Sequence, residues 1–568
     1  MAFNPEFGVI IMGDSEKMEQ ILIEPQKSNS LLLKAETELS KRKYKIVLEV
    51  LVIGFFMMII AAPIINIISN VIDNIGEIRI RLFSDELLGD SQWQMMKSAL
   101  WESFSIAFIA VGIDLIIGFP IAAILTRGEF KGKKIIDFLV DLPMAVPTSA
   151  LGFSVMLFWT IFNILPGRTL IIFVHVAFTY PYIVRNLKIA IEKVNPLLEK
   201  AAMTLSASKL TVLRTISFPL IREGLIAGSI LAFTRSLGET GATMICAGLV
   251  ETAPILVVGL RKQLQLPTAS FLSLVLIIIS LSLLIIVKLV ARRDTTTKKF
   301  WQIHFDWEKY LSKPVFTRGI KILAGILMLI FVLVPSFYIV SQINLPIVKE
   351  ELFDVDNKWA YLWESVVNSF QVGFIVIAID VVFAIAFAFI LTREKWGKAN
   401  EILDAILDIP LTIPSAALGF AVFMFWGPAG IDIAEPGIGM IIFTHLTFTF
   451  PYVVRPIAAQ IKNVDVGHEE ASATLGAAPL TTFRRITFPA IKNGVIAGMI
   501  AAFTRSLGET GATLIVMGAD RTVPVLIVDW VEENAFGSAA FASILVIIIS
   551  AFLLALVRVF TPDIKQRL

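Results

Sequence analysis

The sequence predicts an all-α polytopic membrane protein with about 12 transmembrane helices, arranged as two parallel repeats of six helices. The first observation is composition, since 56% of the residues are hydrophobic and 17% are charged, against roughly 45–50% and about 25% in soluble proteins. The second is that each half contains six apolar stretches long enough for the roughly 20 helical residues that cross a bilayer. The third is an internal repeat, because the string AFTRSLGETGAT occurs unchanged at 232–243 and 502–513.

The repeat runs through the whole chain. The segment at 178–182 returns in nearly the same form at 448–452, and Leu-Thr-Arg at 125–127 returns at 391–393. The chain is therefore a tandem duplication. We expect a cytoplasmic N-terminal tail at 1–44, a first six-helix repeat at 45–300 and a second at 301–568.

The apolar stretches give the predicted spans in order. An even number of spans in each repeat makes the two repeats run in the same direction, related by an axis along the membrane normal. The spans lie near 45–70, 99–125, 135–163, 168–190, 220–248 and 268–291 in the first repeat, and near 318–343, 365–391, 402–427, 437–457, 490–518 and 540–560 in the second.

Basic residues predict the orientation, because cytoplasmic loops carry an excess of Lys and Arg. The loop at 73–90 is instead rich in acids, including Asp85 and Glu86, as expected outside the cell. Both termini are therefore predicted to be cytoplasmic, and the polar segment 1–44 lacks the apolar region of a cleaved signal peptide. The basic clusters are Lys41, Arg42, Lys43 and Lys45; Arg127, Lys131, Lys133 and Lys134; and Arg292, Arg293, Lys298 and Lys299.

The segment between the fourth and fifth spans predicts a helical elbow at the cytoplasmic surface. Asn195 followed by Pro196 is a good cap and first turn for a helix, and Asp465 fits the same place in the second repeat. We expect a short helix, a break at Ser206 or Gly476, and a second helix that leads into the fifth span.

The second elbow resembles the EAA motif of the permeases of ABC importers, through Glu470-Ala471-Ser472 and a glycine six residues after the glutamate. Each half looks like one permease subunit of the type I importer fold, so the chain resembles a fused pair. The resemblance implies that the elbows dock on an ATP-hydrolysing subunit. The first elbow departs from the motif, since Lys200 stands where Glu470 does. The coupling residues implied are Glu199, Ala201, Ala202, Ser206, Glu470, Ala471 and Gly476.

The chain has no GxxxxGK[ST] phosphate loop, so ATP and Mg are expected on another chain. The resemblance implies two copies of an ABC ATPase and an extracytoplasmic substrate-binding protein as partners, beside the lipid of a prokaryotic plasma membrane. We expect no cofactor, metal or nucleic acid on this chain, and no catalytic residues. The matched pair His175 and His445 is interpreted as packing between helices.

The repeated string falls in the predicted fifth span, where each ionisable group costs about 2.5–3.5 kcal/mol. One interpretation is that Arg and Glu, four residues apart, neutralise each other on one helix face. The other is that two symmetry-related helices bring these residues to a central axis as gate and lining of the pathway. The residues concerned are Arg235, Ser236, Gly238, Glu239 and Thr240, with Arg505, Ser506, Gly508, Glu509 and Thr510.

The second spans add Asp114 and Asp380, matched acids near mid-helix. Intramembrane acids are candidates for function, but a hydrogen bond to a neighbouring helix explains them equally well. Paired acids would also suit a proton-coupled secondary transporter, which is the rival class of protein.

The SLGETGAT string is similar to the fifth-span sequence of sulfate, molybdate and tungstate permeases, with some likeness to phosphate permeases. The resemblance implies an oxyanion as substrate, and hydroxyls, backbone N–H groups and Arg are suited to line an anion path. Fused permeases for ferric iron and for thiamine remain the alternatives.

Overall fold

The computed structural model describes residues 3–4, 9–10, 42–84, 89–291, 306–355 and 358–560. Most of the predicted tail, the acids Asp85 and Glu86, and the basic cluster from Arg292 to Lys299 lie outside the described residues. In the described part the regular secondary structure is helical, apart from strands β1 (Phe3–Asn4) and β2 (Val9–Ile10), which pair antiparallel.

The first repeat supplies the predicted spans, with a break in the third and in the fifth. The first span is one helical run, and a helical elbow separates the fourth span from the fifth. The elements are α2 (Arg42–Phe56), η1 (Met57–Ala61), α3 (Ala62–Asp73), α4 (Ile75–Arg79), η2 (Ile80–Ser84), α5 (Gly89–Arg127), α6 (Lys133–Ala145), α7 (Thr148–Thr160), α8 (Arg168–Lys193), α9 (Pro196–Thr204), α10 (Lys209–Val212), η3 (Leu213–Ser217), α11 (Phe218–Leu237), α12 (Gly241–Cys246), α13 (Ala253–Lys262) and α14 (Leu266–Ala291).

The second repeat follows the same order, after a short helix that leads into its first span. Its elements are α15 (Asp306–Leu311), α16 (Pro314–Met328), η4 (Leu329–Leu333), α17 (Val334–Phe337), η5 (Tyr338–Gln342), α18 (Leu345–Lys349), η6 (Glu350–Val355), α19 (Lys358–Arg393), α20 (Lys398–Leu407), α21 (Ile409–Thr412), α22 (Ser415–Trp426), α23 (Ile438–Asn463), α24 (Val466–Thr474), α25 (Pro479–Thr482), η7 (Phe483–Thr487), α26 (Phe488–Leu507), α27 (Gly511–Val516), α28 (Val523–Glu532) and α29 (Phe536–Phe560).

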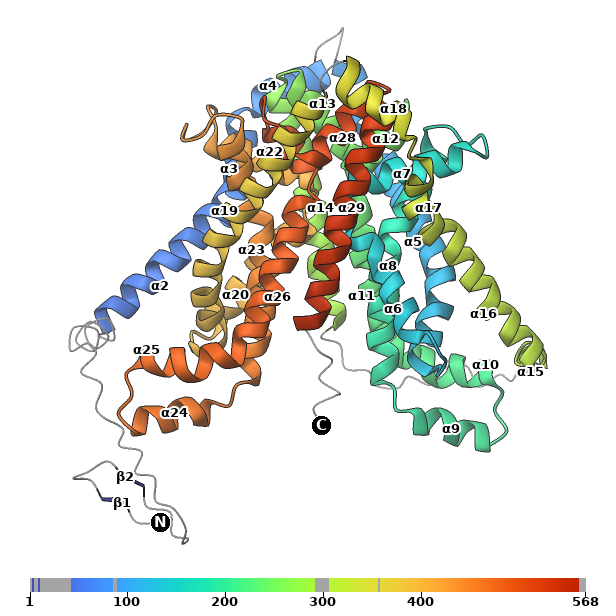
Figure 1. The fold of residues 1–568 in the computed structure, drawn as a ribbon, viewed down its shortest axis with the longest axis vertical. Helices are drawn as coiled ribbons and strands as arrows, with labels where there is room; N and C mark the ends of the chain where they lie inside the picture. Colours follow the sequence, from blue (N-terminus) through green and yellow to red (C-terminus); the bar gives the residue numbers. More distant parts are fainter. Residues whose placement is uncertain are drawn as a thin grey trace.

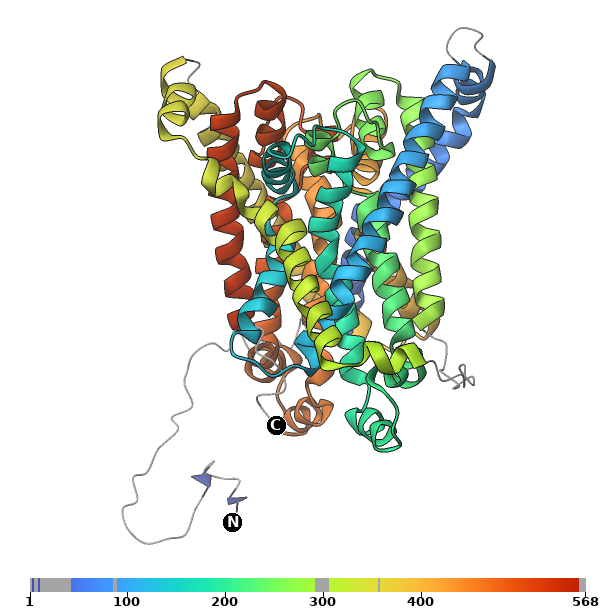
Figure 2. The same ribbon diagram turned by 90° about the vertical axis from the view of Figure 1, so that its right-hand side faces the viewer.

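The described residues contain 10 helices long and apolar enough to cross a membrane, or up to 12 if each of two bent pairs is one span. Both elbows lie at the same end of the molecule in two perpendicular views (Figures 1 and 2). The prediction of two parallel repeats in an all-α membrane protein is thereby confirmed.

The two predicted third spans, 135–163 and 402–427, are not straight helices. Each is a pair of helices bent by 105° in the first repeat and 112° in the second. The bends fall at Pro147 and Pro414, and the residues before them, Val146 and Ile413, are extended. A residue before proline is sterically disfavoured in the α conformation, so the helix ends there.

The predicted fifth spans, 220–248 and 490–518, are also interrupted. The long helices end at Leu237 and Leu507, and short helices resume at Gly241 and Gly511. The repeated string therefore forms a break between two helices rather than the interior of one helix.

The first span of each repeat packs against the other repeat. Phe55 stacks on Phe383 with ring centroids 3.8 Å apart, and Thr447 Oγ1 donates to the Ile59 carbonyl at 3.0 Å. The first span of the second repeat is held in turn by the first repeat, because Ser154 Oγ of α7 donates to the Pro335 carbonyl at 2.7 Å. The two repeats are therefore interlocked by an exchange of their first spans.

Candidate functional site

In each repeat, the break in the repeated string is stabilised by a glutamate that makes both an ion pair and a hydrogen bond to the backbone. Arg235 Nη2 lies 2.8 Å from Glu239 Oε2, while Glu239 Oε1 accepts the Ala242 N–H at 3.2 Å. The second repeat has the same ion pair between Arg505 and Glu509, whose Oε1 accepts the Ala512 N–H at 2.9 Å. The carboxylate thus neutralises the arginine and satisfies a free N–H at the start of the short helix. The structure contains the ion pair that one interpretation of the sequence expected. The second role, in which the glutamate caps the short helix, could not be predicted while the fifth span was taken as one continuous helix.

The two breaks meet each other across the interface between the repeats. A Cβ atom added to Gly241 would lie 2.6 Å from Thr510 Cβ, and one added to Gly511 would lie 2.6 Å from Thr240 Cβ. Gly238 also packs on the other repeat, where an added Cβ would lie 3.0 Å from Pro414 Cα. Only glycine admits this approach, so Thr240 and Thr510 close the space between the repeats at this level.

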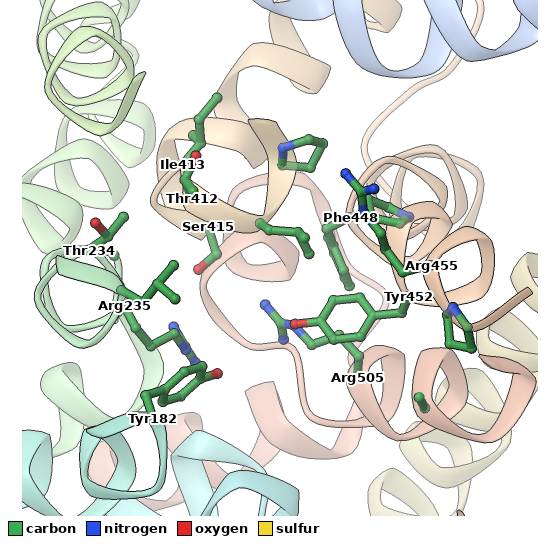
Figure 3. Close-up of a pocket in the computed structure, with 17 residues that line it drawn as sticks. Tyr182, Thr234, Arg235, Thr412, Ile413, Ser415, Phe448, Tyr452, Arg455 and Arg505 are labelled. Atoms are coloured by element: carbon green, nitrogen blue, oxygen red, sulfur yellow. The ribbon is translucent and has the colours of Figure 1, made fainter. Parts of the chain in front are cut away.

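Two cavities of about 390 Å³ each lie on the elbow side of this closure, along the last turns of α11 and α26. Their charged lining consists of four arginines and a single carboxylate, Asp141. Figure 3 shows the first cavity, with Arg235 beside Tyr182 and Arg505 beside Tyr452. The first is lined by Tyr182, Leu231, Thr234, Arg235, Gly238, Pro410, Leu411, Thr412, Ile413, Ser415, Phe448, Pro451, Tyr452, Arg455, Pro456, Ala501 and Arg505; the second by Asp141, Met144, Val146, Thr148, Tyr182, Arg185, Arg235, Tyr452, Ala501, Thr504, Arg505, Gly508, Leu554 and Val557.

Two of these arginines, Arg185 and Arg455, were missed by the sequence analysis. Arg185 forms ion pairs with Asp137 at 2.8 Å and Asp141 at 2.5 Å. Arg455 does the same with Asp404 and Asp408, each at 2.5 Å. The repeat contained the signal, because both arginines obey the same period of 270 residues and face aspartates that also match.

The predicted lining residues divide into two groups. Arg235, Gly238, Arg505 and Gly508 line the cavities. Glu239 and Glu509 have side chains only 3% exposed and lie outside the lining, as do Ser236 and Ser506. The guanidinium groups face the cavity, therefore, while their carboxylate partners are turned into protein.

The serines instead bind the matched histidines. His175 Nδ1 lies 2.7 Å from Ser236 Oγ, and its Nε2 lies 3.0 Å from Thr243 Oγ1. His445 has equivalent partners in Ser506 and Thr513. Both ring nitrogens are satisfied, so the interpretation of this pair as packing between helices is confirmed.

Asp114 and Asp380 are fully buried and bind the neighbouring helix. The Thr179 hydroxyl lies 2.5 Å from Asp114 Oδ2 and 2.7 Å from the His175 carbonyl oxygen. Thr449 has the same two contacts with Asp380 and His445, both at 2.6 Å. Each threonine hydroxyl therefore joins a carboxyl oxygen of the second span to the backbone of the fourth span. The geometry favours a structural role for both acids over a place in the pathway.

Both elbows have the predicted caps and breaks. The Asn195 side chain accepts the Leu197 N–H at 3.0 Å, and the Asp465 side chain accepts the Gly467 N–H at 2.9 Å. The chain reverses at Ser206, with φ of 67°, and at Gly476, with φ of 78°. This left-handed conformation suits glycine and is strained for serine.

Glu199 has its structural counterpart in Glu469, which the sequence analysis overlooked in favour of Glu470. Glu199 accepts from Ser217 Oγ at 2.8 Å and pairs with Arg127 at 3.3 Å. Glu469 accepts from Thr487 Oγ1 at 3.0 Å and pairs with Arg393 at 3.4 Å. These two glutamates join each elbow to the end of the second span and to the fifth, whereas Lys200 and Glu470 are both exposed.

The outer faces of the elbows are open to a partner. Ala201 and Ala471 are exposed, Ala202 is half-buried, and the apolar side chains of Leu205 and Leu475 are 84% and 88% exposed. The two leucines occupy matching positions of the repeats and are exposed at the same end of the molecule (Figure 1), so both elbows present the same apolar side chain to a partner.

The first elbow has an additional contact from the start of the second repeat. Glu308 of α15 is buried against α10, where its carboxylate pairs with Arg214 and accepts from Thr211 Oγ1 at 2.8 Å. Ser312 Oγ accepts the Leu210 N–H at 3.0 Å. Residues assigned by sequence to the second repeat therefore hold the elbow of the first.

Two interlocked bundles around an arginine-lined cavity, each with a surface elbow, define a duplicated membrane permease. The family model of the binding-protein-dependent transport system inner membrane component matches the chain twice, at residues 114–294 and 381–566. The chain belongs to this family and is a tandem fusion of two of its units. The predicted kinship with ABC-importer permeases is confirmed.

Relatives of this chain include permeases that each match less than half of it. The sulfate transport system permease protein CysT of Salmonella typhimurium is 34% identical over 223 residues, which are 36% of this chain and 80% of CysT. The molybdate/tungstate permease WtpB of Methanocaldococcus jannaschii is 30% identical over 240 residues, 41% of this chain and 93% of WtpB. The molybdenum permease ModB of Escherichia coli is 34% identical over 178 residues, 28% of this chain and 76% of ModB.

Proposed function

We propose that this chain is the membrane permease of an ATP-driven importer for a tetrahedral oxyanion of the sulfate, molybdate or tungstate type. The observation that carries the proposal is the pair of adjoining cavities between the repeats, whose combined charged lining is four arginines and one aspartate. Two of these arginines, Arg235 and Arg505, have carboxylate partners that are turned away from the cavities, and a positive face of this kind attracts anions and opposes the passage of cations. It disfavours ferric iron and thiamine, which are both cationic, and the printed names of the relatives point to the same oxyanions.

The elbows are proposed to dock on two copies of an ABC ATPase, which bind and hydrolyse ATP with Mg. The exposed leucines and alanines on both elbows support this, together with the family membership. The elbow side is then cytoplasmic, as we also propose for both termini, and an extracytoplasmic binding protein delivers the substrate to the opposite side of a prokaryotic plasma membrane. The closure at Thr240 and Thr510 separates the cavity from that side.

The test is copurification and reconstitution. The chain, coexpressed with an ABC ATPase and a binding protein from the same source, is expected to form a complex with two ATPase copies and to accumulate radiolabelled sulfate, molybdate or tungstate in ATP-loaded vesicles. Phosphate, ferric iron and thiamine are assayed beside them. The chain alone is expected not to hydrolyse ATP. Accumulation driven by a proton gradient, without ATP or a partner ATPase, would instead establish the secondary transporter.

A further inference from the structure

The two cavities adjoin at a small group of residues that line both of them. The group comprises Tyr182, Arg235, Tyr452, Ala501 and Arg505. Arg235 and Arg505 come from matching positions of α11 and α26, and Tyr182 and Tyr452 from matching positions of α8 and α23. Each repeat therefore contributes one arginine and one tyrosine, and the two pairs face each other across the shared space (Figure 3).

The guanidinium groups are held in place before any ligand arrives. Each forms its ion pair with glutamate through Nη2, and its central carbon lies over a phenylalanine ring, 5.2 Å from Phe178 for Arg235 and 4.8 Å from Phe448 for Arg505. A guanidinium has five N–H donors in a fixed plane, so the ion pair leaves donors for a ligand. Groups fixed in advance lose little conformational entropy on binding.

The electrostatic field at this point favours an anion. The two arginine side chains are 23% and 22% exposed, whereas their glutamate partners are 3% exposed. A ligand in the cavity thus meets the cation first and the carboxylate only at longer range. Low-dielectric surroundings strengthen the charge-assisted hydrogen bonds formed there.

The symmetry of the four donors matches one class of ligand. A tetrahedral oxyanion has two-fold axes that divide its four oxygens into two equivalent pairs. On the axis between the repeats, each pair of oxygens would meet one guanidinium and one phenol. A cavity of about 390 Å³ is at the small end for ligand sites and accommodates such an ion with part of its water.

We propose that Tyr182, Arg235, Tyr452 and Arg505 form a binding site within the permease for one tetrahedral divalent oxyanion. The proposal rests on the proposed function and deepens it, because it assigns substrate recognition to the membrane chain as well as to a soluble binding protein. The site lies directly on the elbow side of the closure at Thr240 and Thr510, where an ion is held after it passes between the repeats.

The test is equilibrium binding to the purified full chain in lipid nanodiscs, without ATP or binding protein. Radiolabelled tungstate and sulfate are the probes, and saturable binding of one ion per chain is expected. The double variant Tyr182→Phe with Tyr452→Phe removes two donors and keeps shape and charge. Its affinity is expected to fall roughly tenfold or more, because hydrogen bonds to charged groups are the stronger ones. Tyr361→Phe, at an exposed tyrosine of α19, is the matched control and should bind normally.

A second variant, Arg505→Lys, preserves charge but removes the planar fork, and it is expected to weaken binding as well. Thermal stability is measured for each variant, so that misfolding is recognised. Unchanged affinity in the folded tyrosine variant would overturn the assignment. So would the absence of saturable binding in a chain whose complex still imports the oxyanion on ATP, and that result would leave the proposed function intact. Failure of both binding and uptake for every oxyanion would reject the proposed function itself.

Discussion

At the scale of single residues, the clearest separation is between acids that support the fold and cations that face the pathway. Asp114 and Asp380 lie on the second spans, which contribute no residue to the lining of either cavity; both acids are buried and bind threonines of the fourth spans. Arg235 and Arg505 lie on the fifth spans and face the cavities. The sequence marked all four as intramembrane charges, but only the packing of the spans decides which of them meet a cavity.

The structural role inferred for the two buried acids leads to a prediction. Replacement by asparagine preserves the size of the side chain and an oxygen that accepts from threonine, so Asp114→Asn with Asp380→Asn is expected to keep ATP-driven uptake within about twofold, because the contact with the neighbouring helix is kept. Uptake into vesicles is the measurement. As a comparison, Asp141→Asn breaks a contact with Arg185 in the lining and is expected to impair uptake clearly. Abolished uptake in the folded double variant would identify the acids as part of a proton path.

At the scale of elements, the elbows agree with their prediction more closely than the spans do. Caps at Asn195 and Asp465 and reversals at Ser206 and Gly476 are local effects, readable from residue type. The bent third spans and broken fifth spans were missed because an average of hydrophobicity over a window passes over a single proline or glycine. Pro147 and Pro414 could have indicated the bends in the third spans. The contact of Gly241 with Thr510 could not be predicted from the local sequence, because it depends on the position of the other repeat.

The matched glutamates of the elbows predict that the two repeats contribute equally to the coupling of ATP hydrolysis to uptake. Glu199→Ala and Glu469→Ala each remove a hydrogen bond and a partly exposed ion pair, worth about 1 kcal/mol together, or about a fivefold change in an equilibrium. We expect similar losses of uptake per ATP hydrolysed in the assembled complex. Glu470→Ala is the comparison, since that side chain is exposed and should affect ATPase binding more than elbow stability. Unequal losses for Glu199 and Glu469 would contradict the structural equivalence.

The contact of helix α15 with the first elbow predicts that the two elbows differ in stability. Glu308→Ala leaves Arg214 without its buried partner, and removal of one member of such a pair costs about 3 kcal/mol. We expect a lower melting temperature and weaker association with the ATPase. Lys309→Ala, one residue away on the exposed face of α15, is the control and should behave as the unmodified chain. Normal stability of the Glu308 variant would mean that the contact does not hold the elbow.

At the scale of the whole molecule, the repeat and its direction could be predicted from sequence, whereas the exchange of first spans could not. Hydrophobicity identifies segments that enter the bilayer, but lipid is as apolar as leucine and does not choose their neighbours. The choice is made by particular contacts, such as Asn66 Nδ2 donating to the Met424 carbonyl at 3.1 Å. Such contacts depend on the final positions of both repeats.

The exchange predicts the behaviour of a divided chain. Residues 1–300 and 301–568, expressed separately, each lack the span that covers part of their bundle and are expected to aggregate or be degraded. Coexpressed, the two fragments are expected to assemble and restore uptake. Size-exclusion chromatography in detergent and uptake in cells measure both outcomes. A stable, monodisperse single fragment would show that each repeat is complete without the exchanged span.

The exchange of first spans also implies a delay during biosynthesis between insertion of the first span and synthesis of the helix that it packs against. Phe55 emerges from the ribosome about 330 residues before Phe383, its stacking partner. At translation rates of about 5–20 residues per second, the first span waits roughly 15–65 seconds in the bilayer before its partner helix is made. During that interval its polar groups, including Asn66, must be shielded by lipid headgroups, by water or by an insertion chaperone. We therefore expect the chain to be most sensitive to membrane proteases in the interval between insertion of the first span and synthesis of its partner helix.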